Sequence, residues 1–244
     1  TNSTILVCIM AANNETGVIQ PFQKIAELTQ KYQVPYLCDT TQYIGKAPFH
    51  FNQSQIDYAV CSGHKLGALT GTGFILVKNP TSFSPFIFGG GQERGMRGGT
   101  QNYIGIETLA MATQICVEEM NLLSDLKSEK EKFESNLKGK IPGCLIIGEE
   151  EERVASTTLL SCPGVHGQGI QIELESQNIF VTTSSACSDN EPRTSRVLRA
   201  MGIDDTVGRS VIRISLCPKQ IKQYKELEET ILKAVTKLKK IASY

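Results

Sequence analysis

The sequence predicts an α/β protein, with a mostly parallel sheet sandwiched by helices in a large domain and a smaller α+β domain at the C-terminal end. Two observations lead to this prediction. Short, continuous apolar runs typical of fully buried strands recur in the first half, at intervals long enough for the crossovers that join parallel strands. After a long helical stretch, the second half changes to shorter strand patterns mixed with helices. We therefore expect the large domain over residues 1–121 and the smaller one over residues 122–244.

The first half is predicted to alternate between strands and crossovers. The first strand is expected at Ile5–Met10, and a helix follows it over Pro21–Tyr32. Two further strands are expected at Pro35–Asp39 and Tyr58–Gly63, and a fourth at Gly71–Lys78. The long connections between the first three strands favour a parallel arrangement.

The second half begins within a long helical region, expected from near Gln101 towards Lys138. Beyond it, strand patterns are expected at 144–148, 156–162, 179–183 and 210–216, with a helix at 169–176. The acidic run Gly148–Arg153 is most simply a solvated loop. The last predicted helix carries apolar residues at three- and four-residue steps, which indicates a core-facing stripe. The stripe consists of Ile221, Tyr224, Leu227, Ile231, Val235, Leu238 and Ile241.

The composition is that of an ordinary soluble globule, with 40% hydrophobic and 20% charged residues. The formal net charge is +0, so no nucleic-acid partner is expected, although "ERGMRGGTQN" has the look of an RNA-binding segment. No apolar run approaches the roughly 20 residues of a membrane span. We expect a cytoplasmic protein whose native N-terminus is absent, because the chain starts at Thr1; organellar targeting therefore stays open.

The eight cysteines are too dilute and too evenly scattered for a disulfide-stapled scaffold, which favours free thiols in a reducing compartment. Cys61 and His64 form a C-x-x-H half-site, but no second pair follows at zinc spacing. No resident metal ion is therefore expected.

Three successive predicted strands end in polar clusters, in "AANNETG", "DTTQ" and "SGHK". Ligands of open parallel sheets bind outside the carboxyl ends of the strands, and parallel strands bring these ends to the same edge. We therefore expect one site containing Asn14, Asp39, Gln42, Ser62, His64 and Lys65.

The combination of side chains in this set favours pyridoxal phosphate as the cofactor. A lysine can form a Schiff base, and an aspartate can keep a pyridinium nitrogen protonated so that the ring acts as an electron sink. Ser62 and His64 could bind the phosphate, while Asn14 and Gln42 could hydrogen-bond the phenolate oxygen. Any one residue alone would be read as a surface charge or a turn residue, so the prediction depends on their concurrence.

Seven motifs follow one another along the chain: "NNETG", "CDTTQYIGK", "SGHK", "GGGQERGMRGGT", "SSACS", "VLRAMGI" and "IRISL". Together, and in this order, they resemble a known family, the cysteine desulfurases of the class-V aminotransferase group. The family pattern has a substantial portion before "NNETG" that this chain lacks. Residues 1–121 would then be the C-terminal part of the cofactor-binding domain.

The resemblance implies a role for each candidate residue. Lys65 would bind the cofactor and shuttle the substrate proton, Arg213 would bind the substrate carboxylate, and Cys187 would be the nucleophile. The remaining implied contacts are Asp39 to the pyridinium nitrogen, Asn14 and Gln42 to the phenolate oxygen, and Ser62, His64 and the partner subunit's Thr100 to the phosphate. The last contact implies a homodimer, and the only metal contact expected is iron–sulfur ligation in transit through Cys187.

The implied reaction removes sulfur from L-cysteine, giving L-alanine and a persulfide on Cys187 for a sulfur-acceptor or iron–sulfur scaffold protein. The alternatives are another enzyme of the group, such as a selenocysteine lyase, an inactive truncated fragment, and a non-catalytic assembly subunit. We also expect that this chain alone binds the cofactor weakly or not at all, because part of the family pattern is missing.

Overall fold

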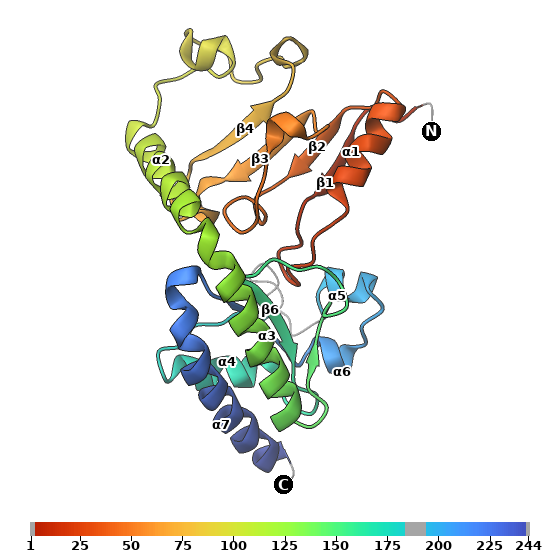
Figure 1. Ribbon diagram of the computed structural model, residues 1–244, viewed down its shortest axis with the longest axis vertical. Helices are drawn as coiled ribbons and strands as arrows, with labels where there is room; N and C mark the ends of the chain where they lie inside the picture. Colours follow the sequence, from red (N-terminus) through yellow and green to blue (C-terminus); the bar gives the residue numbers. More distant parts are fainter. Residues whose placement is uncertain (1–2, 184–193, 243–244) are drawn as a thin grey trace. The chain divides into compact units, whose positions relative to one another are not determined.

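The computed structural model describes residues 3–183 and 194–242, and the chain divides into two compact units (Figure 1). The N-terminal unit consists of Thr1–Ala12 and Ile19–Met120, and the C-terminal unit of Asn13–Val18 and Asn121–Tyr244. A short turn from the start of the sequence thus belongs to the C-terminal unit, which no local pattern predicted. Cys187 lies outside the described residues.

The sheet of the N-terminal unit confirms the α/β prediction of a mostly parallel sheet. Its order is β1-β2-β3-β4, in which the first three strands are parallel and β4 is antiparallel to β3. The strands are β1 (Val7–Met10), β2 (Tyr36–Asp39), β3 (Tyr58–Ser62) and β4 (Gly73–Val77). The connection from β3 to β4 contains only a short turn, so the chain reverses instead of crossing over.

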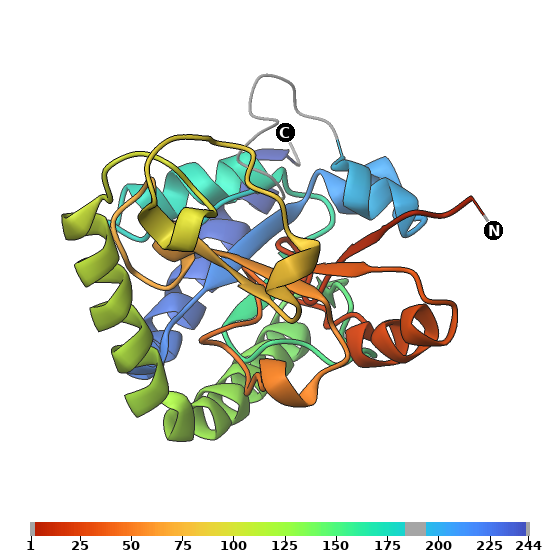
Figure 2. The same ribbon diagram turned by 90° about the horizontal axis from the view of Figure 1, so that it is seen from above.

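Two α-helices accompany this sheet. Helix α1 (Phe22–Lys31) begins directly after Pro21 and contacts β1 and β2, as Figures 1 and 2 show. Phe22 and Ala26 bury its apolar side in a small core. Helix α2 (Tyr103–Glu118) buries only Gly105 and Ala112. The 3₁₀ turns of this unit are η1 (Phe51–Gln53), η2 (Gly63–Lys65), η3 (Pro80–Ser82) and η4 (Gln92–Gly95).

The single helical region expected from Gln101 towards Lys138 is two helices. Helix α2 ends at Glu118, a 3₁₀ turn η5 (Met120–Leu122) follows, and α3 runs over Leu123–Lys140. The division between the two units falls at this turn, so the helices belong to different cores. Helical propensity alone could not locate the break, because both sides of it favour helix.

The C-terminal unit is built on an antiparallel sheet of order β5-β6-β7. Its strands are β5 (Leu145–Ile146), β6 (Thr157–Ser161) and β7 (Val211–Ser215). Its remaining helical elements are α4 (Gly167–Glu175), α5 (Arg196–Ala200), α6 (Asp205–Gly208), η6 (Pro218–Gln223) and α7 (Tyr224–Ala242). The segment predicted as a strand at 179–183 contributes only an isolated bridge, between Thr182 and Arg213.

A large hydrophobic core holds this unit together, with α7 packed beside α3 and α4 (Figures 1 and 2). The predicted α7 stripe lies in this core from Ile221 to Leu238, but Ile241 is exposed. No helix in the described ranges is both long and apolar enough to span a bilayer.

Candidate cofactor and substrate sites

The carboxyl ends of β2 and β3 lie side by side, because these strands are adjacent and parallel in the register Asp39↔Val60. Thr41 ties the two ends together. Its backbone N–H donates to Asp39 Oδ1 at 2.9 Å, and its Oγ1 accepts a hydrogen bond from the Ser62 N–H at 3.3 Å. The Asp39 carboxylate and the Ser62 backbone are thereby held at one edge of the sheet, with Asp39 exposed.

The turn η2 presents the next three residues at the same edge. Ser62 Oγ and His64 Nδ1 lie 2.8 Å apart, and the side chains of His64 and Lys65 are exposed. Close packing favours glycine at position 63, since a Cβ there would lie 3.0 Å from Thr72 Oγ1 and 3.1 Å from the Thr72 carbonyl oxygen. A hydroxyl, an imidazole and an amine therefore follow the end of β3 in a fixed backbone turn.

Gln42 lies in the turn that follows β2. Its side-chain carbonyl oxygen accepts a hydrogen bond from Lys46 Nζ, which leaves the amide nitrogen as a donor. The structure therefore brings Asp39, Gln42, Ser62, His64 and Lys65 into one unit, at the ends of two neighbouring strands.

Three buried or half-buried thiols of this unit are poor nucleophiles. Burial, above all other causes, raises the pKa of Cys38 and of Cys61 to about 11 each, and Asp39 adds to both shifts. Burial also raises the pKa of Cys116. Only a small fraction of these thiols is ionised near neutral pH, and the thiolate is the reactive form.

Asn14 lies in the C-terminal unit, in the turn Asn13–Val18. Asn13 Oδ1 accepts the N–H groups of Glu15 and Thr16 at 2.9 and 3.0 Å, which is the side-chain turn that asparagine favours. Gly17 has a φ of +75°, and a Cβ on it would lie 2.9 Å from Thr157 Cβ. These two properties explain why the motif "NNETG" has asparagine at position 13 and glycine at position 17.

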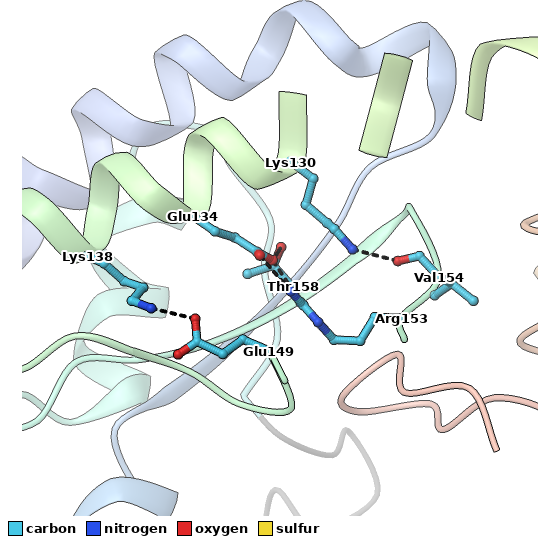
Figure 3. A network of polar contacts seen from close by, with 7 residues as sticks. All are labelled: Lys130, Glu134, Lys138, Glu149, Arg153, Val154 and Thr158. Carbon is cyan, nitrogen blue, oxygen red and sulfur yellow. Dashed lines mark hydrogen bonds and ion pairs between the residues drawn. The ribbon is translucent and has the colours of Figure 1, made fainter. Parts of the chain in front are cut away.

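A buried polar network holds this turn in place (Figure 3). Glu134 on α3 accepts two hydrogen bonds from Arg153, at 2.8 and 2.7 Å, and a third from Thr158 Oγ1 at 2.6 Å. Lys130 is 2% exposed, and its Nζ donates to the Val154 carbonyl at 2.8 Å.

The network reaches the turn through the backbone. Arg153 pairs with Val18 in a β-bridge, and the Val154 N–H donates to the Gly17 carbonyl at 2.9 Å. The expectation that Gly148–Arg153 is simply a solvated loop is therefore wrong for Arg153, whose side chain is 7% exposed. A local charge run does not reveal a long-range partner such as Glu134.

Arg213, in β7, extends to the same turn. Its Nη1 donates to the Asn14 carbonyl at 2.8 Å, and its backbone exchanges hydrogen bonds with Thr182 at 2.6 and 3.3 Å. Burial lowers the pKa of Arg213 and the Glu15 carboxylate raises it, with a net decrease. The structure thus brings together two predicted residues, Asn14 and Arg213, in the C-terminal unit.

The sequence did not single out Glu15, which is 4% exposed and acts electrostatically on Arg213. Its only sequence signal was its place in "NNETG", where a glutamate next to turn-forming residues is usually solvated. Thr100 is exposed in the stretch between η4 and α2, and its contact with a partner subunit stays a prediction.

Comparison with known proteins identifies the family. Residues 1–224 match the family model described as aminotransferase class-V. The chain belongs to the class-V aminotransferase family. A cysteine desulfurase from Trichormus azollae is 36% identical over 220 residues, which cover 89% of this class-V chain and 54% of that protein. Cysteine desulfurase IscS from Rickettsia prowazekii is 35% identical over 225 residues, 88% of this chain and 53% of that protein.

Solved structures give the same fold for this class-V chain. A NifS-like protein from Rickettsia africae superposes with a TM-score of 0.82 at 30% identity, covering 95% of this chain and 62% of its own. A second NifS-like protein gives a TM-score of 0.81 at 35% identity, covering 98% and 61%. The chain therefore spans about half the length of the curated relatives it matches.

Class-V aminotransferases use pyridoxal phosphate, and the side chains at the strand ends are chemically suited to it. Lys65 supplies an amine, Asp39 a carboxylate, and Ser62 and His64 a hydroxyl–imidazole pair. Across residues 3–183 and 194–242, no group of three or more histidine, cysteine, aspartate or glutamate side chains could hold a metal ion.

Proposed function

We propose that the protein is a pyridoxal-phosphate-dependent cysteine desulfurase that acts as a homodimer in a reducing compartment, the cytoplasm. The proposal rests chiefly on one observation: Lys65 and the Ser62–His64 pair follow the end of β3, beside Asp39 at the end of β2. The proposal is also supported by two relatives, 35 and 36% identical to this chain, that are named cysteine desulfurases. Because those relatives are about twice as long, the proposal concerns the full-length gene product.

The residues at the strand ends would hold the cofactor. Lys65 would attach it through its amine, Asp39 would keep its ring nitrogen protonated, and Ser62 and His64 would donate hydrogen bonds to its phosphate. The Gln42 amide nitrogen would donate to the phenolate oxygen, because Lys46 already occupies the amide's carbonyl oxygen. Asn14, and Thr100 of the partner subunit, would complete the set. When bound, the cofactor withdraws electrons from the substrate Cα.

Three residues of the chain would act on the substrate. The Arg213 guanidinium would bind the α-carboxylate of L-cysteine, since its planar donors match a carboxylate. The Lys65 amine would take the proton from Cα and later return one. The Cys187 thiolate would attack the substrate sulfur, so that the substrate Cβ–S bond breaks and a new S–S bond forms. The products would be L-alanine and a persulfide on Cys187, whose outer sulfur passes to an acceptor or iron–sulfur scaffold protein.

Both ends of the segment that carries Cys187 are fixed in the C-terminal unit, which supports this role. On one side Thr182 pairs with Arg213, and on the other Thr194 Oγ1 donates to Asp205 Oδ1 at 2.6 Å. Thr182 therefore lies beside Arg213, the residue proposed to bind the carboxylate.

The test is to incubate the full-length gene product with L-cysteine and to map adducts by mass spectrometry. A mass increase of about 32 Da on Cys187, together with alanine release, is expected. Cys187→Ser should lose the adduct, and Lys65→Ala should lose both the adduct and the absorbance at about 420 nm that the bound cofactor gives. Cofactor-loaded protein that forms no adduct would contradict the proposal. The 244-residue chain alone should show little of this absorbance.

A further inference from the structure

The side chain of Gln42 is held in one orientation by Lys46. An amide has an acceptor end and a donor end, whereas a lysine ammonium can only donate. Lys46 Nζ accordingly binds Gln42 Oε1, which leaves Nε2 and its two protons for other acceptors. Turning the amide by half a revolution would set Nε2 against the ammonium, donor against donor. The orientation of this amide therefore depends on one neighbouring side chain.

The backbone that carries both side chains is anchored to the sheet. The Tyr43 N–H donates to the Thr40 carbonyl at 2.8 Å, and the Lys46 N–H donates to the Tyr43 carbonyl at 3.0 Å. Thr40 is inaccessible to solvent, and its Oγ1 donates to the Val60 carbonyl of β3 at 2.8 Å. Gln42 and Lys46 therefore belong to one fixed turn at the end of β2.

Gly45 packs the end of this turn beside Lys65. Its φ is +77°, and a Cβ on it would lie 2.9 Å from both Leu66 Cδ2 and Cys116 Sγ. Leu66 directly follows Lys65, and its carbonyl accepts the Cys116 thiol at 3.9 Å. The turn thus lies against α2 and the end of η2, next to the lysine proposed to attach the cofactor.

The same turn presents two groups of opposite hydrogen-bonding character. Asp39 Oδ1 accepts the Thr41 N–H at 2.9 Å, and an ionised carboxylate can only accept, so Oδ2 is a second acceptor. Gln42 Nε2 can only donate. A ligand ring that met both groups would need an N–H donor for Asp39 and an acceptor oxygen for Gln42.

We propose that Lys46 is a positioning residue that holds the Gln42 amide as a donor, so that this edge of the sheet selects a pyridine ring whose hydroxyl oxygen is deprotonated. The inference rests on the proposed cofactor role of Gln42. Without Lys46 the amide could turn and accept a hydrogen bond from a protonated hydroxyl, and the two forms of the ring would be distinguished less. The charge of Lys46 acts in the same direction, because a cation favours the anionic form of a nearby oxygen. The ligand class is a phosphorylated hydroxypyridine.

The other titratable groups around Lys46 cannot replace it. Its charge acts on the thiols of Cys61 and Cys116, and burial raises the pKa of both, so these thiols are mostly neutral near neutral pH. Asp39 and Glu119 are the acidic groups that act on the same thiols. An ionised carboxylate has no proton to donate, so neither acid could hold the amide by Oε1.

The first test needs no ligand and follows the ¹⁵N and ¹H signals of the Gln42 side-chain amide, assigned by their loss in Gln42→Ala. A charge-assisted bond to Oε1 should slow rotation about the amide C–N bond about tenfold in the wild type, and Lys46→Met should abolish this slowing. Lys46→Arg should restore it, because a guanidinium also only donates. Lys24→Met, at an exposed lysine of α1, is the matched control. Equal rotation rates in the wild type and Lys46→Met would overturn the inference.

The second test uses the full-length gene product and pyridoxine phosphate, a hydroxypyridine without the aldehyde that reacts with Lys65. Its ultraviolet absorption reports whether the ring oxygen has lost its proton. In the wild type the bound oxygen should lose its proton at a lower pH than in water. Lys46→Met should raise the midpoint by about one pH unit, which is a tenfold change in the equilibrium, and Lys46→Arg should keep the wild-type midpoint.

The outcomes separate this inference from the proposed function. If pyridoxine phosphate does not bind, the proposed cofactor site fails and selection at it fails as well, whatever the amide signals show. If it binds, but Lys46→Met changes neither the amide signals nor the midpoint, only the role of Lys46 is overturned. An amide that rotates faster in Lys46→Met with an unchanged midpoint would overturn the selection of the deprotonated oxygen. The unfolding temperature of each variant confirms that it is folded.

Discussion

The two units of the chain differ in how completely they bury their apolar residues. The C-terminal unit packs α3, α4 and α7 around one large core, in which Leu137, Ile170 and Ile231 are inaccessible to solvent. The N-terminal unit has a small core, and α2 leaves Ile104 67% and Met111 63% exposed. An exposed apolar surface of this extent normally marks a site of contact with another protein segment or subunit. The relatives are about twice as long, so we expect α2 to pack against additional protein in the full-length gene product.

The largest expected effect is in the polar network of the C-terminal unit. Glu134→Gln would leave the Arg153 charge buried beside a neutral amide, and breaking a buried ion pair from one side costs about 3 to 5 kcal/mol. The loss is measured as a decrease in the free energy of unfolding. It is obtained from a urea titration monitored by hydrogen exchange of the α3 amides. Glu131→Gln, at an exposed position of α3, is the matched control. Equal costs for the two variants would mean that the network does not stabilise this unit.

A smaller effect is expected from Lys130, whose pKa is lowered to about 8, mainly by burial. Between about pH 8 and pH 10.4 the unfolded chain binds this proton more tightly than the folded chain does, so stability rises with pH. Relative to Lys130→Met, the wild type should gain about 2 to 3 kcal/mol over this interval. Lys127→Met, at an exposed lysine of the same helix, should follow the wild-type profile. If the stability of Lys130→Met changed with pH in parallel with that of the wild type, the lowered pKa of Lys130 would be contradicted.

The smallest effect is expected in the N-terminal unit. Met111→Ser should change the stability of this chain by less than about 0.5 kcal/mol and should decrease the binding of a hydrophobic dye. By contrast, Leu137→Ala should cost the C-terminal unit about 3 kcal/mol. A cost above about 2 kcal/mol for Met111→Ser would show that α2 is already packed in this chain. The oligomeric state of the chain, measured in parallel, would show whether that packing is against a second copy.

The features that the sequence predicted depend on local pattern. The buried runs located β1, β2 and β3, and the three- and four-residue steps located the core face of α7. The polar residues after β2 and β3 followed from the geometry of parallel strands, which brings such ends to one edge. The assignment of each residue to a contact with cofactor or substrate stays a prediction.

The features that were missed depend on distant pairing. Asn13–Val18 joins the C-terminal unit through Arg153 and Val154, and nothing near the turn in sequence specifies those partners. The burial of Glu15 follows from the same pairing, because an isolated turn would leave its carboxylate in water. The break between α2 and α3 follows from the division into two cores.

The turn Asn13–Val18 also has a consequence for the order in which the protein folds during its synthesis. Ala12 and Ile19, on either side of it, pair with each other in the N-terminal unit, so the turn enters and leaves the other unit within a few residues. During synthesis it emerges long before α3, Arg153 and Val154, and therefore has no docking partner at first. The C-terminal unit is completed only when this early turn docks onto residues that are synthesised much later. A C-terminal fragment that begins at Asn121 would lack this turn, and its Val154 N–H would have no Gly17 carbonyl to bind.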